Sequence, residues 1–390
     1  MKRVLYLSFY FEPDLCAGSF RNSPLAHELA SQLNKTGSVD VITTLPNRYS
    51  TYSTEAKVNE EIGNISIKRI KLPVHKSGFL DQILSFKTFY FETLELVKES
   101  EYDLVFASSS RLFTSFLGFQ IARKKKIPLI LDIRDIFTDT LNDVIPNKII
   151  KFFLLPILRF IESRIFNYAL HINLISAGFE QYFKIYSKPS YSFFTNGIDQ
   201  EFIHSNDYRE NLSESKITIT YAGNIGEGQG LHKIIPKAAK LLGNGYWFRI
   251  IGDGGAKHLL QSEIIVENAT NVSIENPVKR TELLNIYKES HFLFMHLNDY
   301  KAFEKVLPSK VFELGAFPRP IIAGVNGYSR QFIEKFIPNT ILIKPTNSLE
   351  LVYAIKQYTY TIIQREEFIK NFDRRNINRE FASVIVKYLK

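Results

Sequence analysis

The segment from Pro308 to Gly324 combines two kinds of side chain that suit a nucleotide-linked sugar. It reads PSKVFELGAFPRPIIAG, a turn followed by a short predicted helix and an apolar strand. Lys310 places a cation at the start of this helix, where free N–H groups and the helix dipole favour a phosphate. Glu313, one turn further, is the only carboxylate on an otherwise apolar face, and a carboxylate suits sugar hydroxyls. The segment therefore predicts a site for a nucleotide diphosphate.

A glycine-rich turn precedes another predicted helix. Residues 221–231 read YAGNIGEGQGL directly after a strand, so the backbone can approach a ligand closely. The pattern excludes a P-loop and argues against a dinucleotide oxidoreductase. Two explanations of these glycines are equally supported: the loop forms a tight turn for structural reasons, or it binds a phosphate. In IGDGG (251–255), after the next strand, Asp253 either caps a helix, which is favoured, or accepts from a hydroxyl.

Two loops in the first half of the chain carry charged side chains after predicted strands. Gly18 and Ser19 lie after the first strand, and Arg21 follows at a helix start, where it either binds an anion or forms a surface salt bridge. Residues 132–135 read DIRD at the end of a later strand. Their carboxylates either orient a hydroxyl and accept its proton, or pair with Arg134 to fix the loop.

Parallel sheets are needed to bring these loops together. Apolar runs alternate with helical patterns in two series, with strands expected at 4–10, 39–44, 65–72, 103–108, 129–133, 169–175 and 192–194, then at 217–223, 246–251, 272–275, 292–296, 321–323 and 340–343. The fold class predicted is α/β, with two doubly wound Rossmann-like domains facing a central cleft. We expect domains at 1–196 and 197–372, a polar linker at 200–216, and a C-terminal helix at about 373–390 that packs back on the first domain.

Composition narrows the class of protein. The chain has 390 residues, a net charge of +9 and a single cysteine, Cys16, so an intramolecular disulfide is impossible and a cytoplasmic location is expected. The charge fits phosphorylated ligands, an anionic membrane or nucleic acid, and equally a basic soluble protein. Patterns typical of nucleic-acid binding, secretory signals and spanning helices are not found. HExxH, HxxxH and Cys/His clusters are also missing, so we expect no metal site, and His296 is expected to be structural.

Four ordered motifs resemble the retaining glycosyltransferases of family 4, which have the GT-B fold. They are TNGID (195–199), the glycine-rich turn 221–231, IGDGG (251–255) and the segment 308–324, and the resemblance covers nearly the whole chain. DIRDIFTDT (132–140) and AFEKVLPSKVFE (302–313) are similar to motifs of a bacterial branch that transfers N-acetylfucosamine-type sugars in O-antigen and capsule assembly. In this family the sugar nucleotide binds the C-terminal half and the sugar acceptor binds the N-terminal half.

The resemblance implies roles for individual residues. Glu313 would bind the ribose of a UDP-sugar, and Ser309 and Lys310 would meet its diphosphate. The family's upstream Glu lies eight residues earlier, where this chain has Lys305, so Glu304, nine residues earlier, is the candidate contact to the donor sugar. The implied donor site also includes Gly18, Asn224, Gly226 and Gly252.

A further departure lies in the glycine-rich turn, where many members carry Arg and Lys and this chain has Asn224 and Gln229. The diphosphate is therefore expected to rely on the N–H of Gly226 and on Lys310. The sugar acceptor would meet Ser19, Arg21, Arg134 and Asp135. Candidate catalytic residues are Glu304, Lys310, Glu313 and Asp135. We expect nucleotide departure with same-face attack and no cofactor or metal.

The segment 147–170 carries mixed apolar and basic residues. Ile150, Leu154, Ile157, Leu158, Ile161 and Ile165 follow helical spacing and are expected to face the core, with Pro156 as a possible break. The other side mixes Lys148, Lys151 and Arg159 with Phe152, Leu155 and Phe166, which suits an anionic bilayer. The basic run 123–126 adds to this charge. The alternative is a helix buried on both sides.

Together these features favour a metal-independent retaining transferase acting on a lipid-diphosphate-linked saccharide. Its expected location is the cytoplasm, peripheral on the inner face of a bacterial plasma membrane. The alternatives are a GT-B sugar-nucleotide epimerase and a non-catalytic membrane-binding scaffold.

Overall fold

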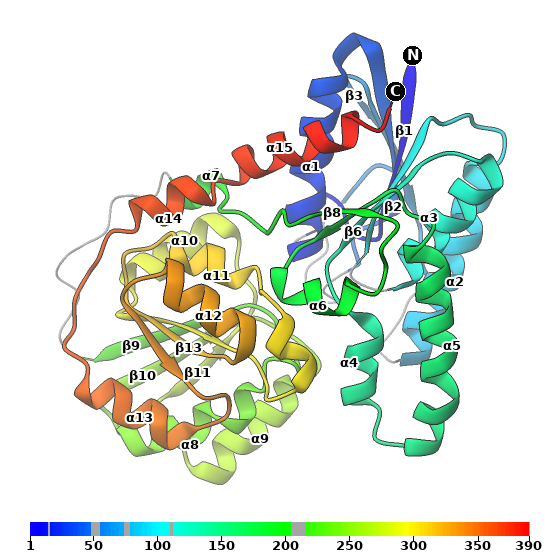
Figure 1. Cartoon of the computed structure of the whole chain (residues 1–390). Coiled ribbons are helices and arrows are strands. Elements are labelled where there is room, and N and C mark those ends of the chain that lie inside the picture. The colour runs from blue at the N-terminus through cyan, green and yellow to red at the C-terminus, as the bar shows by residue number, and fades with distance from the viewer. Residues whose placement is uncertain (15, 48–54, 74–78, 110–111, 204–215, 390) are drawn as a thin grey trace. The chain divides into compact units, whose positions relative to one another are not determined.

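The computed structural model describes residues 1–14, 16–47, 55–73, 79–109, 112–203 and 216–389 (Figure 1). Most of the polar linker expected at 200–216 lies outside the described residues. The chain forms two compact units, which we call the N-terminal unit (Met1–Asn196 with Arg375–Lys390) and the C-terminal unit (Gly197–Arg374). Each is built on a mainly parallel sheet with helical connections, so the predicted α/β class with two Rossmann-like domains is confirmed.

The sheet of the N-terminal unit has, among the described residues, the strand order β3-β4-β2-β1-β5-β6-β7-β8. Every neighbouring pair is parallel except β3 and β4. β5 and β6 are buried along their whole length, and β1 is buried from Val4 onward, because helices can cover both faces of a parallel sheet. The strands are β1 (Lys2–Ser8), β2 (Gly37–Thr44), β3 (Asn59–Ile62), β4 (Ile65–Ile70), β5 (Leu104–Ser109), β6 (Leu129–Ile133), β7 (His171–Leu174) and β8 (Ser190–Ser192).

The helices of the N-terminal unit connect these strands. They are α1 (Ala17–Leu33), η1 (Asn34–Thr36), α2 (Phe79–Leu96), α3 (Leu112–Lys125), α4 (Phe137–Val144), α5 (Lys148–Phe166), η2 (Ala177–Phe179), α6 (Glu180–Phe183) and α15 (Arg374–Val386). Within the described ranges, no helix is both long and apolar enough to cross a membrane.

The C-terminal unit has a fully parallel sheet in the order β11-β10-β9-β12-β13-β14. Its strands are β9 (Ile217–Ala222), β10 (Tyr246–Ile251), β11 (Val272–Glu275), β12 (Phe292–His296), β13 (Ile321–Gly324) and β14 (Thr340–Ile343). Its helices are α7 (Gln200–Ile203), η3 (Leu231–Lys233), α8 (Ile235–Leu242), α9 (Lys257–Glu267), α10 (Arg280–Glu289), η4 (Lys301–Lys305), α11 (Lys310–Gly315), α12 (Gly327–Phe336), α13 (Ser348–Gln357) and α14 (Glu366–Asn371).

Two local differences from the sequence prediction have physical causes. β3 was not predicted, although Gly63, with φ of 60°, makes the tight turn that pairs β3 with β4. The single helix expected at 231–242 is divided into η3 and α8 because Pro236 lies at the start of α8, where its missing N–H costs nothing.

The helix α15 completes the core of the N-terminal unit. The ring of Phe381 is 1% exposed and lies 5.8 Å from the ring of Phe106 and 5.0 Å from that of Phe194, in a stacked pair. Ala382 and Ile385 are fully buried beside it in the same hydrophobic cluster as β1 and α1. The last helix is therefore part of this core and not an appendage.

We predict that Phe381→Ala destabilises the N-terminal unit by about 3–5 kcal/mol, because it leaves a cavity between two aromatic rings. Urea unfolding followed by far-UV circular dichroism measures this loss. The fluorescence of Trp247, which lies in β10, reports the C-terminal unit separately. Tyr353→Ala, at a side chain 69% exposed, is the control. A loss below 1 kcal/mol for Phe381→Ala would contradict the packing described.

Candidate functional site

The carboxylate of Glu313 is held in α11 by two groups. Its Oε1 atom accepts hydrogen bonds from the hydroxyl of Tyr287 at 2.7 Å and from Nζ of Lys310 at 2.8 Å. The side chains of Lys310 and Glu313 are about one-fifth exposed, so both reach solvent. Tyr287, from α10, is fully buried, and burial, together with Glu313, raises its pKa far above the ordinary value. The cluster is therefore a neutral phenol, a cation and a carboxylate that is open on one side.

The glycine-rich turn after β9 lies beside this cluster. A Cβ atom built on Gly223 would lie 3.7 Å from Nζ of Lys310, so the backbone and the ammonium group are close. The predicted contacts of Asn224 and Gly226 are already satisfied within the turn. The amide of Asn224 and the N–H of Gly226 both donate to Oε1 of Gln229, at 2.8 and 3.2 Å. A phosphate would have to replace Gln229 as their acceptor, whereas Lys310 is accessible.

Gly252 has a packing role, which differs from the predicted ligand contact. A Cβ atom at this position would collide with the carbonyl oxygen of Gly223, and φ is 148°. Its N–H already donates to the carbonyl of Glu275 at 3.0 Å. The glycine is therefore required for β10 to approach the glycine-rich turn.

Ser309 and Glu304 flank α11 on its N-terminal side. The carbonyl of Ser309 accepts from the N–H groups of Phe312 and Glu313, so Ser309 begins the helix without a side-chain cap. Glu304 lies in η4 with an exposed side chain. Gly327 packs so closely on the Glu304 backbone that a Cβ would collide with its carbonyl oxygen. The position of Glu304 is thus fixed while its carboxylate remains in solvent.

His296 is a structural residue, as its position after a strand predicted. The N–H of Thr346 donates to its Nε2 at 2.8 Å, so the ring proton must be on Nδ1, which donates to the carbonyl of Gln229 at 2.5 Å. Burial lowers the pKa of His296 to about 4, against the raising effect of the Gln229 carbonyl. The neutral ring therefore ties the glycine-rich turn to β12 and to the loop after β14.

Arg21 forms a buried ion pair in the N-terminal unit, which replaces its predicted contact with the sugar acceptor. Its guanidinium, 2% exposed, binds both oxygens of Asp132 at 2.8 and 2.7 Å. The remaining N–H groups donate to the carbonyls of Phe194 and Thr195. Burial raises the pKa of Asp132, but Arg21 outweighs this and holds the pKa below its ordinary value. Neither the solvent-exposed ion pair nor the anion-binding role considered for Arg21 is therefore found.

Arg134 lies against the first turn of α1, within reach of the charge of Asp132. A Cβ atom on Gly18 would be 3.1 Å from Nη1 of Arg134, so glycine permits this approach. The Nε atom of Arg134 is buried and has no hydrogen-bond partner among the described residues. Ser19 is buried in the same turn. A buried Nε atom that lacks a hydrogen-bond partner in the described part of the chain, beside a helix N-terminus, suits an anion such as a phosphate.

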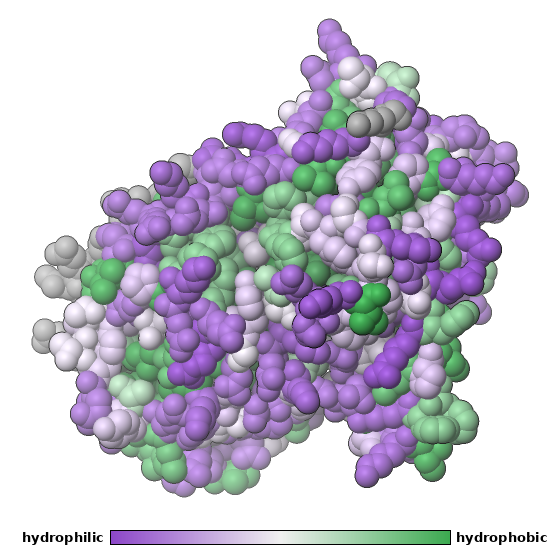
Figure 2. Space-filling view, viewed as in Figure 1, coloured by the Kyte–Doolittle hydropathy of each residue, from purple (hydrophilic) through white to green (hydrophobic). Residues whose placement is uncertain are grey.

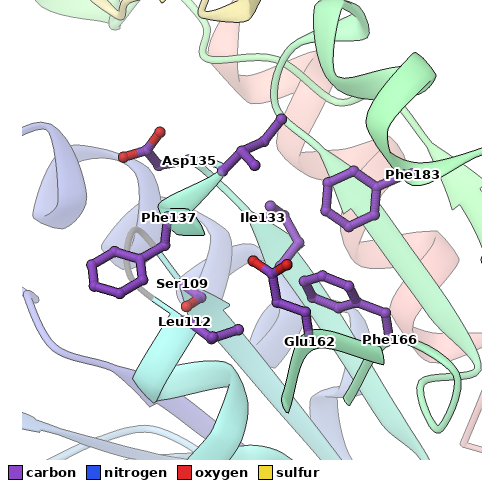
Figure 3. A pocket seen from close by; sticks show the side chains of 9 residues that line it. Ser109, Leu112, Ile133, Asp135, Phe137, Glu162, Phe166 and Phe183 are labelled. Atoms are coloured by element: carbon purple, nitrogen blue, oxygen red, sulfur yellow. The ribbon is translucent and has the colours of Figure 1, made fainter. Parts of the chain in front are cut away.

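Asp135 and Glu162 line one pocket of the N-terminal unit, together with apolar side chains that include Ile133, Phe137 and Phe166 (Figure 3). The two carboxylates point in different directions in this view. Burial raises the pKa of Asp135 to about 6, which the hydroxyl of Thr140 partly offsets. A carboxylate with a pKa near neutrality can accept a proton from a hydroxyl group.

Glu162 and Tyr287 were not identified from the sequence. Glu162 is 1% exposed and accepts 2.6 Å hydrogen bonds from Thr138 and Tyr182, which join α5 to α4 and α6. The signal was its helical spacing with Leu158 and Ile165, which places a charge among core positions. Tyr287 similarly occupies a core position of α10, where its hydroxyl needs a partner.

The described side chains contain no group of three or more His, Cys, Asp or Glu that could hold a metal ion. Among the predicted site residues, Lys310 in the C-terminal unit and Arg134 in the N-terminal unit are cations that suit an anion.

No model of a known protein family matches the chain. In sequence, 180 residues are 27% identical to the protein named "Putative colanic acid biosynthesis glycosyl transferase WcaI" of Escherichia coli (strain K12). This match covers 45% of the chain and 44% of that relative, so it spans less than half the length of either.

Solved structures resemble the chain over nearly its whole length. Sucrose-phosphate synthase from Thermosynechococcus elongatus has a TM-score of 0.78, with 12% identity and coverage of 99% of both chains. Anabaena Alr3699/HepE in complex with UDP-glucose has a TM-score of 0.69, with 14% identity and coverage of 99% of this chain and 100% of that one. The chain therefore has the GT-B fold of two Rossmann-like units.

We predict that Arg21→Met destabilises the N-terminal unit by about 3–5 kcal/mol, because it leaves the charge of Asp132 buried and unpaired. Urea unfolding by circular dichroism measures the loss, and the Trp247 fluorescence transition should not move. Arg330→Met, which removes a surface pair with Glu334, should cost less than about 1 kcal/mol. Equal effects of the two substitutions would show that the buried pair contributes no more than the exposed one.

We predict that His296 makes the C-terminal unit less stable in acid. The unfolded chain takes up a proton near pH 6.5 and the folded unit only near pH 4, so stability falls as pH decreases through this window. In His296→Asn, the dependence of unfolding free energy on pH should be shallower by up to about 1.4 kcal/mol per pH unit. Trp247 fluorescence in urea measures it. The exposed His258→Asn is the control, and parallel curves for wild type and His296→Asn would refute the assignment.

Proposed function

We propose that this chain is a glycosyltransferase that uses a UDP-sugar. The observation that carries the proposal is the Lys310, Glu313 and Tyr287 cluster beside Gly223, because a cation suits a diphosphate and a carboxylate suits sugar hydroxyls beyond the carboxyl ends of parallel strands. The names of the similar proteins support it, since they include a glycosyl transferase of colanic acid biosynthesis and a structure in complex with UDP-glucose.

In the proposed reaction, the C-terminal unit binds the sugar donor. Glu313 accepts from the ribose hydroxyls and Lys310 neutralises the diphosphate, while Glu304 contacts the donor sugar. The bond between the anomeric carbon and the diphosphate oxygen breaks, and UDP leaves with its charge stabilised by Lys310. An acceptor hydroxyl attacks the same face, so the configuration is retained, and no metal is required.

The sugar acceptor is proposed to bind the N-terminal unit as a lipid-diphosphate-linked saccharide. Arg134, together with Ser19 in the first turn of α1, is proposed to bind its phosphate. Asp135, whose pKa is raised to about 6, accepts the proton of the attacking hydroxyl. The donor sugar is proposed to be of the N-acetylfucosamine type, with the product used in O-antigen or capsule assembly on the inner face of a bacterial plasma membrane.

We predict that Lys310→Met weakens UDP binding about 10- to 100-fold, because a charge-assisted contact to phosphate is lost. Glu313→Gln should weaken it about tenfold through the ribose. Isothermal titration calorimetry measures both, with Glu334→Gln, at an exposed carboxylate of α12, as the control. Unchanged UDP affinity in both cluster variants would overturn the donor site, and no UDP binding by wild type would favour a non-catalytic scaffold.

A panel of sugar nucleotides with a lipid-diphosphate acceptor tests the activity itself. Transfer should persist in EDTA, and nuclear magnetic resonance of the product should show the anomeric configuration of the donor. An inverted product would refute the retaining mechanism. Conversion of the sugar nucleotide without an acceptor would indicate an epimerase.

A further inference from the structure

The helix α5 exposes an unusual number of large apolar side chains. Six of them form what we call the α5 apolar face: Ile149 (70% exposed), Ile150 (51%), Phe152 (74%), Phe153 (64%), Ile157 (57%) and Phe160 (65%). Figure 2 shows hydrophobic residues gathered over this helix at the lower right. A soluble monomer rarely exposes a contiguous patch of such residues, and the patches that do occur commonly mark an interaction surface.

The exposed residues lie on one side of a continuous helix. At 100° per residue, the six side chains fall within an arc of about 160°. The opposite side packs on the unit through Leu158, Glu162, Ile165 and Phe166. Ile150 and Ile157 are therefore not core residues and Phe166 is not exposed, which corrects three predicted positions. Pro156 does not divide the helix, which runs unbroken from Lys148 to Phe166.

The charged side chains of α5 that border this face are basic. Lys148 and Arg159 are exposed along one margin, Lys151 is partly buried, and Arg164 lies over the ring of Phe160 at 6.0 Å. The stretch 145–161 contains no acidic residue. Arg123 and Lys124 add exposed cations at the end of α3, which packs against α5. Aromatic and aliphatic side chains bordered by cations match the interface of an anionic bilayer.

A second apolar strip lies on the neighbouring helix α2. Ile83, Leu84 and Phe91 are between 47% and 59% exposed there. Both α2 and α5 pack against α3, so the three helices belong to one layer. Exposed apolar side chains therefore occur on α2 as well as on α5.

We propose that the α5 apolar face inserts into the headgroup region of an anionic bilayer, with α5 lying along the membrane surface. This goes beyond the proposed sugar transfer, and it can be tested without any activity measurement. A second copy of the chain is the less favourable occupant. A symmetric dimer through this face would bring the basic margins of the two copies together, and the stretch 145–161 has no acidic residue to pair with them.

Vesicle binding of the full chain provides the first test. We expect it to sediment with vesicles of phosphatidylglycerol and phosphatidylcholine, at least about tenfold more strongly than with phosphatidylcholine alone. Phe152→Ser/Phe153→Ser/Phe160→Ser should lower binding at least tenfold. Ile265→Ser/Val266→Ser, at side chains 79% and 73% exposed on α9, should leave it unchanged. Equal loss in both variants, or no binding by wild type, would overturn the proposal.

Charge and insertion are tested separately. Lys148→Glu/Arg159→Glu should reduce binding to anionic vesicles, whereas Lys356→Glu/Lys370→Glu, at exposed cations of the C-terminal unit, should have little effect. In a Trp247→Phe background, Phe152→Trp provides a single fluorophore on the face. Its emission should shift to the blue and be quenched by brominated lipids. A dimer in solution that the triple Phe→Ser variant dissociates, with no emission shift on vesicles, would assign the face to a second copy and refute insertion.

Discussion

The N-terminal unit depends on one buried carboxylate at the end of β6. Asp132 is fully buried, and it remains charged because Arg21, a hydroxyl of β5 and an amide of β7 all donate to it. Arg21 also donates to two carbonyls after β8, so a single ion pair fixes the start of α1, three strands and the segment that follows them. Gly18, Arg134 and Asp135 all lie on the backbone that it fixes. The positions of these candidate residues therefore follow from an ion pair that is itself buried.

The C-terminal unit positions its candidate residues with neutral groups instead. The ring of His296 joins two loops through one proton and one lone pair, and the hydroxyl of Tyr287 holds the carboxylate of Glu313. Neutral hydrogen bonds avoid the desolvation cost of a buried charge. They leave Lys310 and Glu313 as the charges of the cluster, at its partly exposed edge. In each unit, one set of buried side chains holds the candidate residues in position, and the candidate residues themselves are a separate set.

The positions of most strands and the class of fold could be predicted because apolar periodicity and strand-end loops are local properties of the sequence. The positions of Lys310 and Glu313 near the glycine-rich turn followed from the same pattern. Partners that depend on three-dimensional packing could not be predicted. Nothing in the spacing shows that Arg21 meets Asp132, 111 residues away, or that Gln229 occupies the N–H of Gly226. The two faces of α5 were partly misassigned because an apolar helix gives no contrast between its buried and exposed sides.

The packing of α15 also bears on how the protein forms during synthesis. The ring of Phe381 and its buried neighbours belong to the core of the N-terminal unit, yet they follow the whole C-terminal unit in the chain. A ribosome therefore releases the C-terminal unit as a contiguous segment before the N-terminal unit has received its last core residues. Domains that fold in order of synthesis usually begin at the N-terminus. The N-terminal unit is therefore the first to emerge, but its core is completed only after the C-terminal unit has been synthesised. Until then, the apolar surface that α15 covers is open to chaperones.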